Sequence, residues 1–169
     1  MRIYLPTTLP LLAAAREAGC FTASRDAGPG GLPAHAVTPA VREWYTEGDL
    51  EELEYTALLE AAEASLHLLA DDAAAPRRRV VVAADVPDAV VRPGGRFRSS
   101  VRLQVPVELS SAVSVHVDET TVAETIAAAA AAAAALAAEA GDDDARFLVD
   151  EAEACDLLWY DVTELGDLV

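Results

Sequence analysis

The chain contains no lysine: all 12 of its basic residues are arginine, against 29 aspartates and glutamates, so the formal net charge is −17. Without lysine there is no Walker phosphate-binding loop, no Schiff base with a carbonyl substrate and no lysine general base. The excess of acid repels a nucleic-acid backbone and an anionic lipid surface, since both bind through clusters of basic residues. We therefore expect neither nucleic acid nor membrane as a partner.

Aromatic residues, cysteines and long apolar runs are scarce as well. Aromatics make up 5% of the chain while alanine supplies 37 of the 169 residues, so bulky side chains for a core are few. Cys20 and Cys155 are too few and too far apart for a metal knuckle or a disulfide framework, and we expect reduced thiols. The longest apolar span, 126–138, is shorter than the ~20 residues of a membrane helix. No basic and apolar leader opens the chain, which predicts a cytoplasmic protein.

The length predicts a single domain over residues 1–169. Two stretches rich in glycine and proline, residues 20–36 and 86–100, lack apolar periodicity. Such composition is typical of surface loops. We predict that both are mobile.

Helix-start signals recur along the chain. They lie at Thr7 or Thr8, at Thr38-Pro39, at Asp49 with Glu52, at Thr121 with Glu124, and at 142–144. The helix predicted from Asp49 to about Ala70 has the best amphipathic pattern. The helix after Thr121 contains nine consecutive alanines, 127–135. Because alanine buries little surface, this helix must pack close to a neighbour or contribute weakly to stability.

Strand patterns lie between these helices. Residues 80–84 are apolar on both faces and predict a central strand. Val113, Val115 and Val117 alternate with Ser114, His116 and Asp118, which predicts a strand with one exposed face. Ile3 with Leu5, a weaker run at 101–107 and a final run at 157–162 complete the predicted strands. The triplet Arg77-Arg78-Arg79 precedes the central strand, and we expect it to pair with carboxylates or stay solvated rather than bind phosphate.

This order of elements predicts an α+β fold. It matches a two-layer, ferredoxin-like sandwich with a split β-α-β arrangement, in which helices cover one face of a four-stranded sheet. The alternative is a small three-layer α/β, Rossmann-like fold. No glycine-rich turn follows a predicted strand, so dinucleotide binding is unsupported.

Acidic groups at strand ends are the candidates for metal chemistry. Converging carboxylate oxygens are the ligands that Mg²⁺ prefers. The candidate ligands are Asp85, Asp88, His116, Asp118 and Glu119. The same residues also serve as helix caps and turn residues, and strand ends need not meet in an antiparallel pair. We therefore predict no cofactor, with Mg²⁺ as the alternative.

A contact surface is the second candidate. If the face of the sheet without helices carries them, the side chains of Tyr4, His116, Trp159 and Tyr160 would form a mixed polar and aromatic platform suited to a protein partner or a homodimer. The aromatics are otherwise core residues. No serine or cysteine lies in a nucleophile turn such as G-x-S-x-G, so nucleophilic catalysis is not expected.

Five segments together resemble an actinobacterial family of uncharacterised proteins, a domain of unknown function. They are MRIYLP at 1–6, HAVTPAVREWY at 35–45, EELEY at 51–55, VHVDE at 115–119 and LLWY at 157–160. The resemblance spans the whole chain, and arginine-only basicity agrees with a genome rich in G and C. It implies no reaction, ligand or site residue. We therefore predict a structural, regulatory or partner-binding module, with a divalent-metal enzyme as the alternative.

Overall fold

The computed structural model describes residues 1–23, 31–45, 47–138 and 142–169. Within these residues, seven strands form one antiparallel sheet in the order β5-β6-β3-β1-β4-β8-β9, and β2 and β7 form a separate ribbon. The strands are β1 (Arg2–Thr7), β2 (Cys20–Phe21), β3 (Leu32–Ala36), β4 (Val80–Asp85), β5 (Val91–Pro93), β6 (Ser100–Leu103), β7 (Val107–Glu108), β8 (Ala112–Asp118) and β9 (Leu157–Asp161). The helices are α1 (Leu9–Ala18), α2 (Pro39–Trp44), α3 (Leu50–Asp71), α4 (Ala123–Ala138), α5 (Asp143–Glu153) and α6 (Leu165–Leu168).

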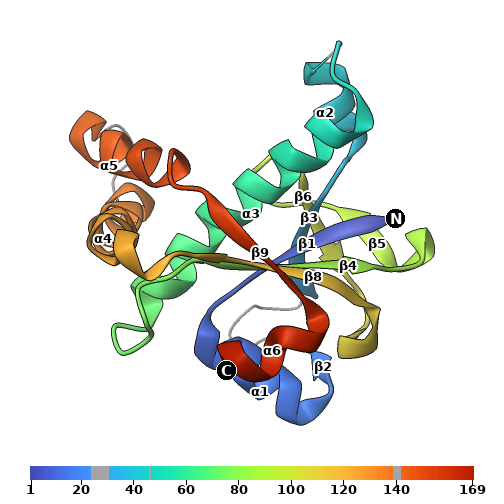
Figure 1. Ribbon diagram of the computed structural model, residues 1–169. Helices are drawn as coiled ribbons and strands as arrows, with labels where there is room; N and C mark the ends of the chain where they lie inside the picture. Colours follow the sequence, from blue (N-terminus) through green and yellow to red (C-terminus); the bar gives the residue numbers. More distant parts are fainter. Residues whose placement is uncertain (24–30, 46, 139–141) are drawn as a thin grey trace.

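The α+β class is confirmed, but the four-stranded ferredoxin-like sheet is wrong. Helices cover both faces of the larger sheet: α3 crosses one face with α4 and α5 beyond it, and α1 and α6 lie on the other (Figure 1). The layers resemble those of the Rossmann-like alternative, yet every strand pair is antiparallel.

The additional strands come from the two segments predicted as loops. Within 20–36 lie β2 and β3, and 24–30 lies outside the described residues. Within 86–100 lies β5, which pairs with β6. All three strands are short, and β3 and β5 contain Pro33 and Pro93, so they carry no alternating pattern that sequence analysis can detect.

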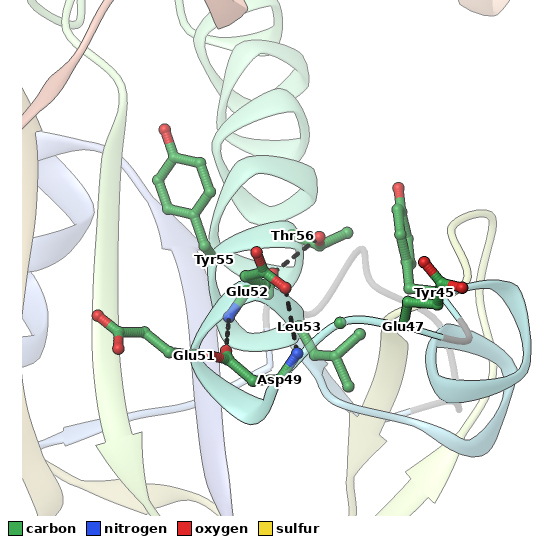
Figure 2. A pocket seen from close by; sticks show the side chains of 9 residues that line it. Tyr45, Glu47, Asp49, Glu51, Glu52, Leu53, Tyr55 and Thr56 are labelled. Carbon is green, nitrogen blue, oxygen red and sulfur yellow. Dashed lines mark hydrogen bonds between the residues drawn. The ribbon is translucent and has the colours of Figure 1, made fainter.

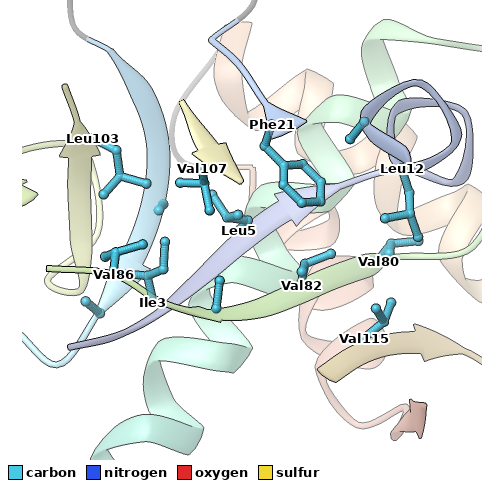
Figure 3. Close-up of a cluster of buried hydrophobic side chains, with 14 of the residues drawn as sticks. Ile3, Leu5, Leu12, Phe21, Val80, Val82, Val86, Leu103, Val107 and Val115 are labelled. Atoms are coloured by element: carbon cyan, nitrogen blue, oxygen red, sulfur yellow. The ribbon is translucent and has the colours of Figure 1, made fainter. Parts of the chain in front are cut away.

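The centre of the sheet is apolar on both faces, as predicted for residues 80–84. Val80 and Val82 of β4 pack in a cluster with β1, α1 and the β2–β7 ribbon (Figure 3). Val81 and Ala83 point to the opposite face, where they contact α3. Burial on both faces places β1 and β4 at the centre of the hydrophobic core.

The helix caps largely follow the sequence. Thr8 caps α1, Thr38 caps α2, and Asp49 with Glu52 forms a reciprocal capping box at α3. The predicted box of Thr121 with Glu124 is wrong. A 3-10 turn, Thr120–Val122, leads into α4 instead, and the Thr121 hydroxyl donates to Glu119 Oε2 at 2.9 Å.

The alanine-rich helix α4 packs between neighbours. Ala129, Ala130 and Ala133 are buried with Leu66 of α3 and Val149 of α5. By length and composition alone, the 18-residue stretch Thr120–Ala137 could also cross a membrane. The sequence analysis counted only the shorter apolar span 126–138 and did not indicate this. The arrangement is compatible with a soluble protein.

Candidate functional site

The five candidate metal ligands do not converge. Asp85 accepts from Arg2 Nε at 2.8 Å, and Asp88 accepts from the amino group of Met1 at 2.9 Å. Val80 of β4 pairs with Val117 of β8, so Asp85 and Asp118 lie at opposite ends of this antiparallel pair. The described part of the chain contains no group of three or more His, Cys, Asp or Glu side chains placed to hold a metal ion. We therefore do not retain the Mg²⁺ site.

Asp118 instead belongs to a buried ion pair with Arg79. Asp118 is 0% exposed and Arg79 is 1% exposed. Arg79 Nη2 donates to Asp118 Oδ1 at 2.7 Å, and Arg79 Nε donates to Asp118 Oδ2 at 2.9 Å. A further bond from Arg79 Nη2 to the Cys155 carbonyl, 2.8 Å, ties the pair to the segment before β9. The pairing expected for the arginine triplet thus holds for Arg79.

The exposed face predicted for β8 is correspondingly wrong. Ser114 and Asp118 are buried and His116 is half-buried. Partial burial lowers the pKa of His116, and its Nε2 lies 3.1 Å from Ser114 Oγ. The carboxylate of Glu119, the last candidate ligand, accepts from the Thr121 hydroxyl. The alternation correctly predicted that the polar side chains of β8 share one face. That face is not exposed, however, because helices cover both faces of the sheet.

The predicted contact platform is divided between the two faces of the sheet. His116 pairs with Val81 on one side and Trp159 on the other, so all three side chains lie on the α3 face. Tyr4 shares that face but is only 6% exposed beneath α3, where burial raises its pKa to about 12. Tyr160 points to the opposite face. Of the four predicted residues, only Trp159 is well exposed.

The surface that does stand open is the outer edge of β9. Trp159 is 60% exposed and Leu158 is 40% exposed. Asp118 N donates to Arg79 O, so the backbone groups of Asp118 point toward β4. Backbone direction alternates along an antiparallel strand, so the next residue, Val117, directs its N–H and C=O toward β9. By this alternation Leu158 and Tyr160 bond to β8, while the backbone groups of Leu157 and Trp159 point outward. Asp161 N also points outward and is bonded by Glu164 of its own capping box.

The opposite edge of the sheet differs from β9 in composition. The edge strand β5 has three residues, Val91-Arg92-Pro93. Short length, charge and proline are the usual protections of a strand edge against pairing with another chain. In β9 only the last residue, Asp161, is charged, and the sequence Leu157-Leu158-Trp159-Tyr160 before it contains no charge and no proline, so it is the less protected edge of the sheet.

Sequence analysis missed a polar cluster at the turn between β5 and β6. Ser99 Oγ donates to Glu60 Oε2 of α3, and His35 Nδ1 of β3 lies 2.6 Å from Ser99 Oγ. Because the serine proton goes to Glu60, His35 must donate from Nδ1. Burial lowers the pKa of His35 to about 4, so the imidazole is neutral at pH 7. No local pattern in the sequence indicates this cluster, because its three residues come from separate segments.

An open cavity beside the start of α3 is strongly acidic (Figure 2). Its carboxylates are Glu47, Asp49, Glu51 and Glu52, and Tyr45 and Tyr55 also line it. Asp49 and Glu52 are bonded to each other's backbone as the cap of α3. Two of the four carboxylates therefore serve helix formation.

Comparison with known proteins places the chain in a family without assigning a reaction. A family of unknown function, DUF6912, matches residues 1–169. No curated protein and no solved structure matches the chain. The resemblance found in the sequence is thus confirmed as a family of unknown function, and its actinobacterial origin stays a prediction. The chain belongs to the DUF6912 family.

Proposed function

We propose that this protein is a partner-binding module that accepts an extended protein segment as an added strand along β9. The observation that carries the proposal is the less protected edge itself, with Trp159 60% exposed beside Leu158. Edge strands of this kind recruit peptides by β-augmentation. In Figure 1, β9 runs along the outside of the sheet with its outer side uncovered by another strand.

The backbone of β9 sets where an added strand would pair. Leu157 and Trp159 offer outward N–H and C=O groups, and these main-chain bonds supply affinity. Asp161 N is already bonded by Glu164, so pairing ends there. Trp159 on one face and Leu158 on the other would contact alternate side chains of the partner, which supplies specificity.

Charge selects the chemistry of the partner. The chain carries −17 overall, and Asp156 and Asp161 flank the apolar part of β9. An acidic protein repels acidic segments and attracts basic ones at long range. We therefore expect a partner segment with alternating apolar and basic residues.

Synthetic peptides test the proposal directly. A seven-residue peptide alternating arginine and valine is expected to bind, whereas the same peptide with glutamate in place of arginine is not, as measured by fluorescence anisotropy at 150 mM NaCl. Trp159→Pro removes an outward N–H and is expected to weaken binding at least tenfold. Trp44→Ala, which removes an exposed tryptophan far from β9, is the control and should bind normally.

Three results would contradict the proposal: no binding of the basic peptide at millimolar concentration, equal binding of both peptides, or full binding by Trp159→Pro. Sedimentation of the protein alone tests whether a second copy of the chain pairs with β9. A dimer that Trp159→Pro dissociates would show that a second copy of the chain, rather than a basic partner, pairs with β9.

A further inference from the structure

Arginine is concentrated at the sheet edge opposite β9. The hairpin of β5 and β6 carries Arg92, Arg96, Arg98 and Arg102. Among the residues that the structure describes, no carboxylate forms an ion pair with any of the four, although acidic residues outnumber arginines 29 to 12 in the chain. Such a concentration of arginines without a direct ion-pair partner in an acidic protein needs a physical explanation.

The hairpin even places two arginines directly opposite each other. Arg92 of β5 pairs with Arg102 of β6. Like charges in this position destabilise a strand pair. The Arg92 guanidinium turns away and donates to the carbonyls of Ala89 and Val91, both at 2.8 Å. Arg102 is half-buried and lines a cavity on the α3 side of the sheet.

This cavity, of about 320 Å³, lies between the hairpin, β3 and α3. Its charged and titratable lining consists of Arg96, Arg102, His35 and His67, and the described lining contains no carboxylate. Its volume is at the small end of the range for ligand sites. Arg96 Nη1 donates to His67 Nε2 at 3.4 Å, which leaves the other guanidinium hydrogens available to a ligand.

The turn has a backbone that brings these groups together. Gly95 has φ +143°, and a Cβ there would lie 2.4 Å from Ser100 Cβ, so glycine is required. The Ser100 hydroxyl oxygen accepts from Phe97 N at 3.0 Å, which fixes the turn and leaves the serine hydrogen free to donate. The Phe97 ring packs 5.4 Å from the His35 ring and 5.6 Å from the Arg96 guanidinium.

We propose that this cavity binds the hydrogen phosphate dianion. Arg96 and Arg102 pair with its anionic oxygens, and Ser100 donates a further hydrogen bond. His35 donates from Nδ1 to Ser99, so its Nε2 is an acceptor and takes the P–O–H hydrogen of the ligand. Glu60, through Ser99, holds this tautomer in place.

The state of His35 predicts which oxyanion binds. Sulfate has the shape and charge of hydrogen phosphate but no hydrogen at pH 7. When sulfate is bound, the lone pair of His35 Nε2 therefore faces a lone pair of a sulfate oxygen, and no hydrogen bond forms between them. This mismatch strongly disfavours sulfate binding. We expect phosphate to bind at least tenfold more tightly than sulfate.

Calorimetric titration with inorganic phosphate, sulfate and glycerol phosphate at one ionic strength tests the site. Phosphate is expected to bind, and sulfate at least tenfold more weakly. Most glycerol phosphate molecules carry no P–O–H hydrogen at pH 7, so glycerol phosphate should also bind more weakly than phosphate, and its preferential binding would overturn the role proposed for His35. Arg102→Gln and the exposed Arg96→Gln should each weaken phosphate at least tenfold. Arg42→Gln makes the same charge change on α2 and should leave affinity unchanged.

His35→Asn supplies a second readout. Asparagine retains a donor toward Ser99 but has no atom at Nε2, so discrimination between phosphate and sulfate should disappear. Equal affinity for phosphate and sulfate in the wild type, or phosphate affinity that Arg96→Gln and Arg42→Gln lower equally, would identify general charge screening and overturn the proposal. Absence of phosphate binding at millimolar concentration would overturn it as well. None of these results depends on the β9 edge.

Discussion

At the scale of single residues, two of the ion pairs in the molecule differ in their consequences for stability. Arg79 and Asp118 are buried and joined by three side-chain contacts. Arg2 and Asp85 make a similar pair in solvent. Water screens the exposed pair, whereas removal of one partner from the buried pair leaves an uncompensated charge.

We expect Asp118→Ala to lower the free energy of unfolding by about 3–5 kcal/mol, because Arg79 would then be buried without a counter-charge. Asp85→Ala, the matched control, is expected to cost no more than about 1 kcal/mol. Urea denaturation followed by circular dichroism measures both. Equal losses from the two variants would show that burial does not set the importance of these pairs.

His35 makes the stability of the protein decrease at acidic pH. Its pKa falls from the ordinary 6.5 to about 4 on folding because it is buried. Between these values the unfolded chain binds a proton that the native state does not, so stability is complete above pH 6.5 and is lost as the pH falls toward 4. The loss is on the order of 3 kcal/mol, since each pKa unit corresponds to ~1.4 kcal/mol.

Denaturation at pH 7 and pH 4.5 measures this contribution. Carboxylates also titrate in this range, so the difference between wild type and His35→Asn isolates the histidine. The variant should lose less stability on acidification, by about 2–3 kcal/mol. His116→Asn, which changes a half-buried histidine of β8, should show a smaller difference. A steeper acid loss in His35→Asn than in the wild type would contradict the assigned pKa.

At the scale of elements, α4 shows that its alanines are not interchangeable. Ala129 is buried between α3 and α5, while Ala128 is exposed. Ala129→Leu should destabilise the protein by about 1–3 kcal/mol, because the added methyl groups have no space. Ala128→Leu should lie within about 0.5 kcal/mol of the wild type. Thermal denaturation distinguishes them, and equal stabilities would mean that α4 packs loosely.

Helix caps could be predicted from the sequence, whereas strands such as β3 and β5 could not. Caps at Thr8, Thr38 and Asp49 were predicted because capping is local: one side chain bonds a backbone group two or three residues away. The strand β3 was missed because it is stabilised by pairing with the distant segments β1 and β6. The strand β5 pairs with the nearby β6 but was missed because it has only three residues, one of them a proline. Their prolines and glycines give the local signal of a loop.

At the scale of the whole molecule, the net charge of −17 opposes compaction. We expect the melting temperature to rise by several degrees between 20 and 300 mM NaCl, since 300 mM salt shortens the Debye length below 8 Å. At this chain size, 1 kcal/mol corresponds to about 2–4 °C. A melting temperature that stays constant or falls would indicate that attractive surface pairs outweigh the repulsion. Sodium sulfate at equal ionic strength controls for the identity of the anion.

Among the candidate site residues too, sequence analysis could read local patterns but could not tell which distant residues come together. Trp159 was one of four candidate contact residues whose alternative was a place in the core, and the sequence could not decide between them; it is 60% exposed, whereas Tyr4 is buried. Asp85 and Asp118 were grouped by proximity to strand ends, yet the antiparallel register separates them. His35, Glu60 and Ser99 come from three distant segments, so no local pattern joins them.

The sequence by itself determined the acidity, the absence of lysine chemistry, the α+β class, the main helices with their caps, and the central strand at 80–84. Composition, periodicity and capping act over a few residues, so they can be read along the chain. Only the tertiary structure decided the order of the seven strands, the cover on both faces of the sheet and the open edge at β9. It also decided that Arg79 pairs with Asp118, while the arginines of the β5–β6 hairpin form no ion pair with a carboxylate among the described residues. These features depend on which distant segments come into contact, and the free energy of those contacts is not encoded in any single stretch of the sequence.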